Sequence, residues 1–165
     1  MVKTENRNVA LLSIYPKYAD AILEGTKSVE FRRSVISNNV SRVVIYSTSP
    51  VKKVVGYFEV KALEIRTPKE LWKKFNKTAG VGFDDFFKYY QGKNKGCGIV
   101  VGKVVKFKNP LGLNDLSPAL SPPQSYVYLD WNKIGRVLDP LSHKNNFIGR
   151  IFEKFKAPSF LNGFL

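Results

Sequence analysis

The sequence lacks most of the residues from which common catalytic and metal sites are built. Its 165 residues include one cysteine and one histidine, Cys97 and His143. A single cysteine can form neither an internal disulfide nor a thiolate metal cluster, and we expect Cys97 to be a small buried residue. A single histidine gives little support to a Ser-His-Asp triad, a two-histidine zinc site or a His-His ribonuclease. We therefore expect no metal site.

Other absences narrow the class of protein further. The sequence has no glycine-rich phosphate loop with its lysine, and its longest apolar runs are far shorter than a membrane span. Residues 1–8 are polar, and the apolar segment that follows the basic start of a secretory signal is missing. These observations predict a soluble, cytoplasmic protein, and nothing in the sequence calls for a cofactor.

Acidic residues are scarce. The chain has 13 Asp and Glu against 27 Lys and Arg, a formal net charge of +14. This excess predicts a polyanionic partner, most often a nucleic acid, rather than an anionic membrane surface. The plainer alternative is a protein from a generally lysine-rich proteome. The length and the 44% hydrophobic content favour one folded body, and we expect a monomer or a weak dimer.

Short apolar runs, many β-branched and glycine-punctuated, predict an α+β fold built on a curved sheet. The predicted strands are residues 9–14, 42–48, 54–66, 98–107 and 126–129, together with the stretch 25–33. Helices are predicted at 16–24, from Thr67 with Glu70 closing a capping box, and at 83–90, whose aromatic stripe we expect to be core. Gly56 predicts a bulge or close backbone approach, and composition predicts a loop over 109–123. Together these features predict a mixed β-barrel with short interposed helices.

The sequence changes character near residue 130. We predict a barrel domain over 1–130 and a C-terminal extension over 131–165. Within the extension, apolar residues from Phe147 to Phe155 form the stripe of a basic amphipathic helix. We expect this helix to pack on or near the barrel, although a basic polar face also suits nucleic acid. An alternative is a partner-binding regulator that uses this helix as its main contact.

The most heavily charged strand lies within Gly25–Arg33. Alternation places Val29 and Phe31 on the core side. Lys27 shares their parity but begins the strand, so its stem can lie on the core while its ammonium reaches the rim. The residues of opposite parity must face water or a ligand: Ser28, Glu30 and Arg32.

Two kinds of chemistry are open to this group. Lys27 can serve as a base or nucleophile if burial or the neighbouring cations Arg32 and Arg33 depress its pKa, an effect that Glu30 opposes. Alternatively, Lys27 and Arg32 bind a phosphate or a base edge while Glu30 accepts a hydrogen bond from an exocyclic amine. The plainest interpretation of Glu30 and Arg32 is an exposed ion pair worth about 0 to 1 kcal/mol.

These residues resemble a known family. The pattern Gly25-x-Lys27-x-x-Glu30-x-Arg32 is similar to the G-x-K-x-x-E-x-R signature of ASCH domains, compact barrels related to PUA domains. Three flanking patterns agree in order and spacing, so that the resemblance extends over residues 9–130: Leu12-Ser13-Ile14-x-Pro16, Val55-Gly56-x-Phe58-Glu59-Val60 and Pro123-Gln124-Ser125.

The resemblance implies a partly open PUA-like barrel of five or six strands, with a charged cleft that recognises a nucleic acid or nucleotide: RNA rather than DNA, or a modified or flipped nucleotide. Lys27, Glu30 and Arg32 carry over from the family signature as the site, and we predict seven nucleic-acid-binding residues in all: Lys27, Glu30, Arg32, Arg33, Tyr46, Gln124 and Ser125. Some ASCH proteins are ribonucleases and others are amidohydrolases of acetylated cytidine, so the alternative is a metal-independent hydrolase with Lys27, Glu30 and Arg32 as catalytic residues. The amidohydrolases have a threonine where this chain has Glu30, and a downstream glutamate that is missing here from residues 76–82. Glu59 is a possible second acid if its strand lies beside the signature strand.

Overall fold

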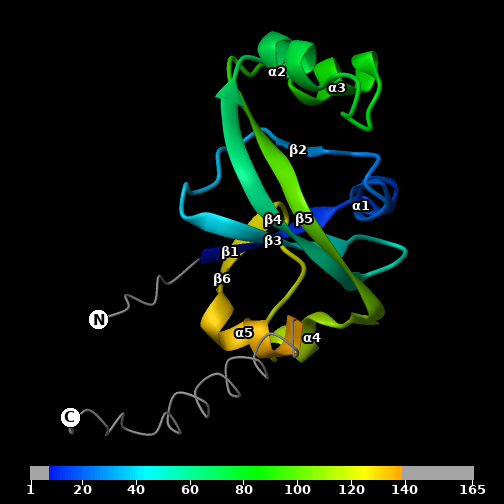
Figure 1. Ribbon diagram of the computed structural model, residues 1–165, viewed down its shortest axis with the longest axis vertical. Coiled ribbons are helices and arrows are strands. Elements are labelled where there is room, and N and C mark those ends of the chain that lie inside the picture. Colours follow the sequence, from blue (N-terminus) through cyan, green and yellow to red (C-terminus); the bar gives the residue numbers. More distant parts are fainter. Residues whose placement is uncertain (1–7, 139–165) are drawn as a thin grey trace, which may run out of the picture.

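A computed structural model describes residues 8–138 of the protein, and Figure 1 shows a strongly curled sheet with helices at both ends. The six strands are β1 (Asn8–Ile14), β2 (Val29–Arg32), β3 (Val40–Ser47), β4 (Lys53–Arg66), β5 (Gly96–Leu111) and β6 (Tyr126–Asp130). The five helices in this part of the chain are α1 (Pro16–Leu23), α2 (Pro68–Phe75), α3 (Phe83–Tyr89), α4 (Leu113–Leu116) and α5 (Trp131–Leu138).

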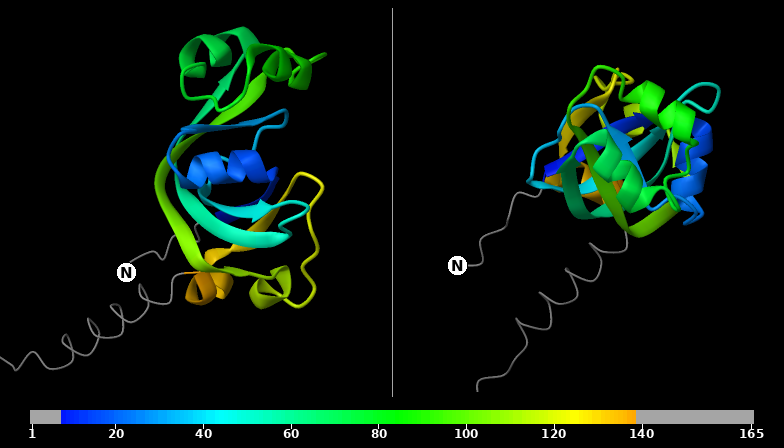
Figure 2. Two further views of the ribbon diagram at one scale, coloured as in Figure 1. Left: turned by 90° about the vertical axis from the view of Figure 1, so that its right-hand side faces the viewer. Right: turned by 90° about the horizontal axis from the view of Figure 1, so that it is seen from above.

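All six strands form one mixed sheet in the order β2-β5-β4-β3-β1-β6, so β2 and β6 are its two edges. The pair β1–β3 is parallel and the other pairs are antiparallel. The long antiparallel pair β4–β5, whose strands are joined through α2 and α3, runs along the height of the molecule (Figure 2). The sheet bends around α1 (Figure 2). This architecture confirms the predicted α+β fold with a partly open mixed barrel of six strands.

A glycine accounts for part of the bend. The pairing of β4 with β5 shifts register between Val54 and Gly56, as a bulge requires. A Cβ atom at Gly56 would collide with the backbone carbonyl oxygen of Val105 on β5. The close backbone approach predicted from the sequence is confirmed, because no side chain fits between these two strands.

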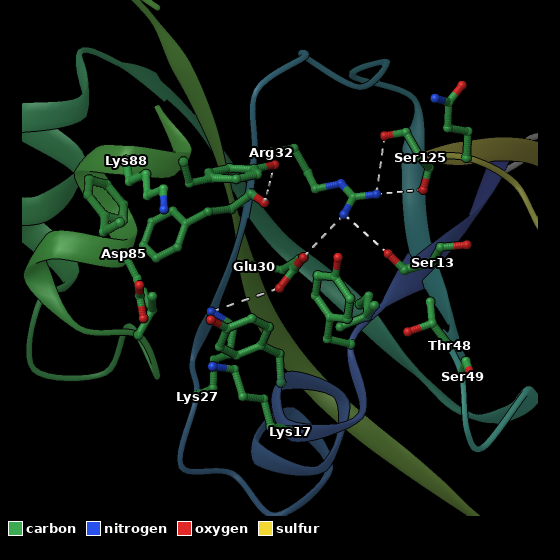
Figure 3. Close-up of a pocket in the computed structure, with 18 residues that line it drawn as sticks. Ser13, Lys17, Lys27, Glu30, Arg32, Thr48, Ser49, Asp85, Lys88 and Ser125 are labelled. Carbon is green, nitrogen blue, oxygen red and sulfur yellow. Dashed lines mark hydrogen bonds and ion pairs between the residues drawn. The ribbon is translucent and has the colours of Figure 1, made fainter. Parts of the chain in front are cut away.

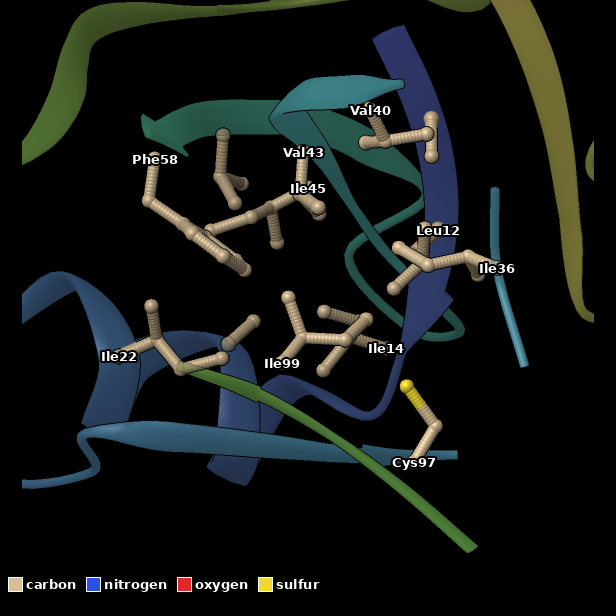
Figure 4. Packing of buried hydrophobic residues seen from close by; sticks show 13 residues of the cluster. Leu12, Ile14, Ile22, Ile36, Val40, Val43, Ile45, Phe58, Cys97 and Ile99 are labelled. Atoms are coloured by element: carbon tan, nitrogen blue, oxygen red, sulfur yellow. The ribbon is translucent and has the colours of Figure 1, made fainter. Parts of the chain in front are cut away.

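Alternation along the strands divides the core into three clusters. Leu12 and Ile14 of β1 face α1 and pack with Phe58 and Ile99 (Figure 4). Residues of opposite parity, such as Leu11, pack on the other side of the sheet against α4 and α5. The third cluster joins two residues of β2 to α2 and α3: Val29, Phe31, Leu71, Phe75, Ala79, Phe86 and Tyr90.

Several local predictions are confirmed. Thr67 caps α2, with the predicted capping box to Glu70. Cys97 is fully buried in the first cluster. Phe86 is buried at the centre of the third cluster, as expected of an aromatic core stripe, although Phe83 of the same helix is 57% exposed.

The segment expected to be a loop over residues 109–123 is partly regular. Strand β5 continues to Leu111, and the short helix α4 follows because Leu113 and Leu116 fill the second cluster. Two buried leucines three positions apart outweigh a composition rich in Pro, Gly and Asn.

The C-terminal predictions are tested little by the structure. Helix α5 directly follows β6 and buries Ile134 and Leu138 in the second cluster. The division at residue 130 stays a prediction, and both His143 and the expected amphipathic helix over 147–155 lie outside the described residues. Within residues 8–138, no helix is long and apolar enough to cross a membrane.

Candidate functional site

A pocket of about 1020 Å³ opens where five separate segments meet (Figure 3). It is lined by the end of β1 and the first turn of α1, by β2 and the residues before it, by the segment after β3, by α3, and by residues 124–125. Polar groups at its base come from β2 and from Lys27 just before it, and aromatic side chains from α1 and α3 line its walls. A concave site of this size suits one small organic group, because ligand pockets are commonly about 300–1,000 Å³.

Lys27, Glu30 and Arg32 form the base of the pocket, and we call these three residues the polar floor. They are 3%, 6% and 9% exposed. The carboxylate of Glu30 lies between the two cations, with Oε2 3.9 Å from Lys27 Nζ and Oε1 3.5 Å from Arg32 Nη1. Val29 and Phe31 face the third cluster, so the predicted alternation is confirmed, with the polar side turned to a pocket.

Lys27 is more deeply buried than the sequence suggested. We expected its ammonium at the rim, but Nζ donates a 2.5 Å hydrogen bond to the backbone carbonyl oxygen of Ala79, between α2 and α3. The nitrogen also lies 4.9 Å from the ring centroid of Phe31, a cation–π distance. The stem of Lys27 runs against Gly80, which adopts φ +65°. A Cβ atom at Gly80 would lie only 3.0–3.1 Å from the carbon atoms of that stem, closer than ordinary van der Waals contact.

Arg32 closes the sheet on itself. Its Nη2 donates to the carbonyl oxygen of Ser125 over 2.5 Å, and its Nη1 donates to the carbonyl oxygen of Ser13 over 3.4 Å. The hydroxyl of Ser13 in turn donates to the carbonyl oxygen of Pro123 over 2.6 Å. The edge strand β2 is thereby joined to the end of β1 and to the segment that leads into β6.

The electrostatics of the floor follow from burial and from unequal numbers of charges. Burial lowers the pKa of Lys27, although the nearby Glu30 carboxylate opposes the shift. Burial also raises the pKa of Glu30, against the attraction of Lys27 and Arg32. One carboxylate faces two cations, and a guanidinium does not lose its proton in proteins. Burial therefore makes the charged form of the Lys27 amine less favourable than it is in water.

The rim carries groups that sequence reasoning did not single out. Tyr15 is 69% exposed at the first turn of α1, with Lys17 two residues later, and Lys88 and Tyr89 lie opposite on α3. Asp85, also on α3, is a second acidic residue of the lining, besides Glu30 on the floor. The sequence indicated helix α1 through its first residue, Pro16. No local sequence pattern, however, indicates that α1 and α3 line the same pocket.

Of the other four predicted binding residues, two line the pocket and two do not. Gln124 and Ser125 line the pocket beside the polar floor. Arg33 is exposed outside the lining, and its Nη2 donates to the carbonyl oxygen of Gln91. Tyr46 is buried in the second cluster and does not line the pocket. Glu59 is exposed on β4, and β5 separates that strand from β2, so the condition for a second acid is not met.

Residues 12–111 match the family model of the ASCH domain. The chain belongs to the ASCH domain family. The ASCH domain-containing ribonuclease of Zymomonas mobilis is 30% identical over an alignment of 133 residues, and the match covers 78% of this chain and 89% of that protein. The crystal structure of ASCH from Zymomonas mobilis superposes with a TM-score of 0.73 at 28% identity, covering 79% of this chain and 94% of the other.

Another relative of this ASCH chain is much longer than the match. The large ribosomal subunit protein uL22 of Ureaplasma parvum serovar 3 is 33% identical over 126 residues. This chain covers 40% of that protein's length, and the match takes in 76% of this chain. Within the described part of this chain, no group of three or more His, Cys, Asp or Glu residues is placed to bind a metal ion.

Proposed function

We propose that this ASCH protein binds single-stranded RNA and takes one unstacked nucleotide into the pocket above Lys27, Glu30 and Arg32. The observation that carries the proposal is a buried, charged floor beneath an open pocket with aromatic walls. Buried charges are costly unless they are paired, and their retention on a pocket floor favours a role in ligand recognition. A floor of opposite charges can hydrogen-bond the polar edge of a base.

The rim suits the remainder of such a ligand. Tyr15 and Tyr89 offer aromatic faces on which bases stack, which is how proteins commonly hold single-stranded RNA. Lys17 and Lys88 supply positive charge for the flanking phosphates. The net charge of +14 favours a polyanion, and one relative of similar length is named a ribonuclease.

Fluorescence anisotropy with a labelled single-stranded RNA, at low and at physiological salt, tests the binding. We expect affinity to fall steeply as salt increases, because bound lysines release counterions from the phosphates. The proposal fails if no binding is seen, or if the affinity is insensitive to salt.

A matched pair of substitutions tests the location. Tyr15 lines the pocket and Phe83 does not, yet both are exposed aromatic residues on short helices or their caps. Tyr15→Ala is expected to weaken RNA binding about tenfold, a usual loss for one stacked base, whereas Phe83→Ala should leave it within about twofold. Equal effects would place RNA binding outside the pocket.

A second candidate function is cleavage of the bound RNA, favoured by the lowered pKa of Lys27. A neutral Lys27 amine would accept the proton of a 2′-hydroxyl as its oxygen attacks the adjacent phosphorus. The bond to the 5′ oxygen breaks, that oxygen takes a proton from water, and a 2′,3′-cyclic phosphate remains. Glu30 and Arg32 would hold the amine in position.

Cleavage is tested with labelled RNA in the presence of EDTA. Products are expected from the wild type, and none from Lys27→Met or from RNA with 2′-O-methyl groups. Absence of products from the wild type, or products that persist in Lys27→Met, would remove this candidate and leave the binding proposal standing.

A further inference from the structure

The polar floor has unused hydrogen-bonding capacity on one side chain. Within residues 8–138, the Glu30 carboxylate receives no hydrogen bond, and its two ion-pair contacts are as long as 3.9 and 3.5 Å. The side chain is 8% exposed and lines the pocket. Figure 3 shows it between Lys27 and Arg32, at the centre of the floor. A buried carboxylate without hydrogen-bond donors is costly, so a ligand that supplies donors is favoured.

The two neighbouring cations are more fully engaged. Both terminal nitrogens of Arg32 donate to backbone carbonyl groups, of Ser125 and Ser13. Lys27 donates to the carbonyl oxygen of Ala79. The Nε–H of Arg32 is buried without a partner among the described residues. The floor therefore leaves an acceptor at Glu30 beside a donor at Arg32, which suits a ligand edge that carries both N–H groups and an acceptor.

The four RNA bases differ sharply in such edges. Guanine presents two adjacent donors, N1–H and N2–H, and their spacing matches the two oxygens of a carboxylate. Adenine and cytosine place a ring-nitrogen acceptor beside their amino group, and its lone pair would be repelled by a carboxylate. Uracil has one N–H between two carbonyl oxygens. An ionised carboxylate consequently discriminates in favour of guanine.

The pocket also offers a donor for the rest of the ring. Thr48 lines the pocket, and its Oγ1 is buried without a hydrogen-bond partner among the residues described. A hydroxyl can donate to the O6 or N7 acceptor of guanine. Two polar groups of complementary kind in the same lining make base selection chemically possible.

We propose that the pocket selects guanine, with Glu30 accepting hydrogen bonds from N1–H and N2–H of the unstacked base. The inference rests on the proposed RNA-binding function and adds the identity of the base. It assigns Glu30 the role of specificity-determining residue. The stacking residues, by contrast, contact any base, and the rim lysines contact the phosphates.

Base selection is tested by anisotropy with uridine heptamers that carry guanine, adenine, cytosine, uracil or hypoxanthine at the central position. The backbone is 2′-O-methylated so that cleavage does not occur. The guanine oligomer is expected to bind about tenfold more tightly than the adenine, cytosine and uracil oligomers, as for one bidentate base contact. Hypoxanthine keeps N1–H and lacks the 2-amino group, so its oligomer should have intermediate affinity.

The protein side is tested with Glu30→Gln, which keeps the shape and replaces one acceptor oxygen by an NH2 group. It is expected to remove the preference for guanine, so that the guanine and all-uridine oligomers bind this variant with similar affinity, and circular dichroism checks its folding. The hypoxanthine comparison needs no variant, so the inference stays falsifiable if Glu30→Gln unfolds.

The outcomes separate the two proposals. Equal affinity for all oligomers overturns the guanine inference and leaves RNA binding intact. A preference for cytosine or adenine, which a protonated Glu30 would favour, also overturns it. Absence of binding to every oligomer overturns the proposed function, and the inference with it.

Discussion

The guanidinium of Arg32, on the edge strand β2, donates a 2.5 Å hydrogen bond to the carbonyl oxygen of Ser125, directly before the opposite edge strand β6. A side chain thus bridges the two edges that backbone pairing leaves open. The same guanidinium is the partner of Glu30 in the pocket. Closure of the barrel and assembly of the polar floor therefore depend on one residue.

Replacing this residue with lysine should cost stability even though the charge is kept. Arg32→Lys loses the planar fork that reaches Ser125 and Ser13 together, and we expect the free energy of unfolding to fall by about 1–3 kcal/mol. The measurement is urea denaturation followed by circular dichroism. Arg33→Lys is the matched control, because Arg33 is exposed and should change stability by about 0.5 kcal/mol or less. Equal effects at the two positions would contradict the bridging role.

The pH dependence of stability should reveal the buried amine. Burial holds the pKa of Lys27 below its ordinary 10.5, so between the folded pKa and 10.5 the unfolded chain binds more protons. The free energy of unfolding then rises with pH in this window. Wild type should gain stability relative to Lys27→Met as the pH increases from neutral to about 10, in urea titrations at each pH. Lys17→Met, at an exposed position, controls for the loss of one charge, and a difference that is constant or shrinks would refute the prediction.

A pair of glycine substitutions separates backbone strain from contact with Lys27. Gly80 and Gly92 have φ of +65° and +75°, and only a Cβ at Gly80 would press on the Lys27 stem. Each change to alanine should cost about 1–2 kcal/mol for the left-handed backbone. Gly80→Ala alone should also weaken RNA binding, because it displaces the amine from the floor. The check is anisotropy beside thermal denaturation, and similar RNA affinities for the two variants would speak against this.

The reactivity of the single thiol, Cys97, tests whether the core around it stays closed. Cys97 is fully buried, and burial raises the pKa of its thiol. Its reaction with a disulfide reagent should therefore be slow and should accelerate with denaturant in step with global unfolding. Because the chain has one cysteine, the measurement needs no variant. Rapid reaction of the native protein would show that this part of the barrel opens locally.

Local signals predicted most of the sheet and the identity of the floor. The β-branched runs gave the strands, Thr67 and Glu70 gave the start of α2, and alternation separated Phe31 from Glu30. What was missed depends on contacts between distant segments. Ser13 and Pro123 are 110 positions apart, and Lys27 and Ala79 are 52 apart. No local pattern encodes that α1 and α3 approach each other, so the burial of Lys27 and the tyrosine rim were not predicted.

The contact between Lys27 and Ala79 ties the floor to the segment that joins α2 and α3. The neighbouring Ser28 makes two more hydrogen bonds to this segment. Its backbone N–H donates to the carbonyl oxygen of Thr78, and its hydroxyl donates to the hydroxyl oxygen of Thr78. The segment between β4 and β5, which contains α2 and α3, thus forms one wall of the site. Substitutions in this connection are therefore expected to change both the pocket wall at Val81 and the position of the Lys27 amine.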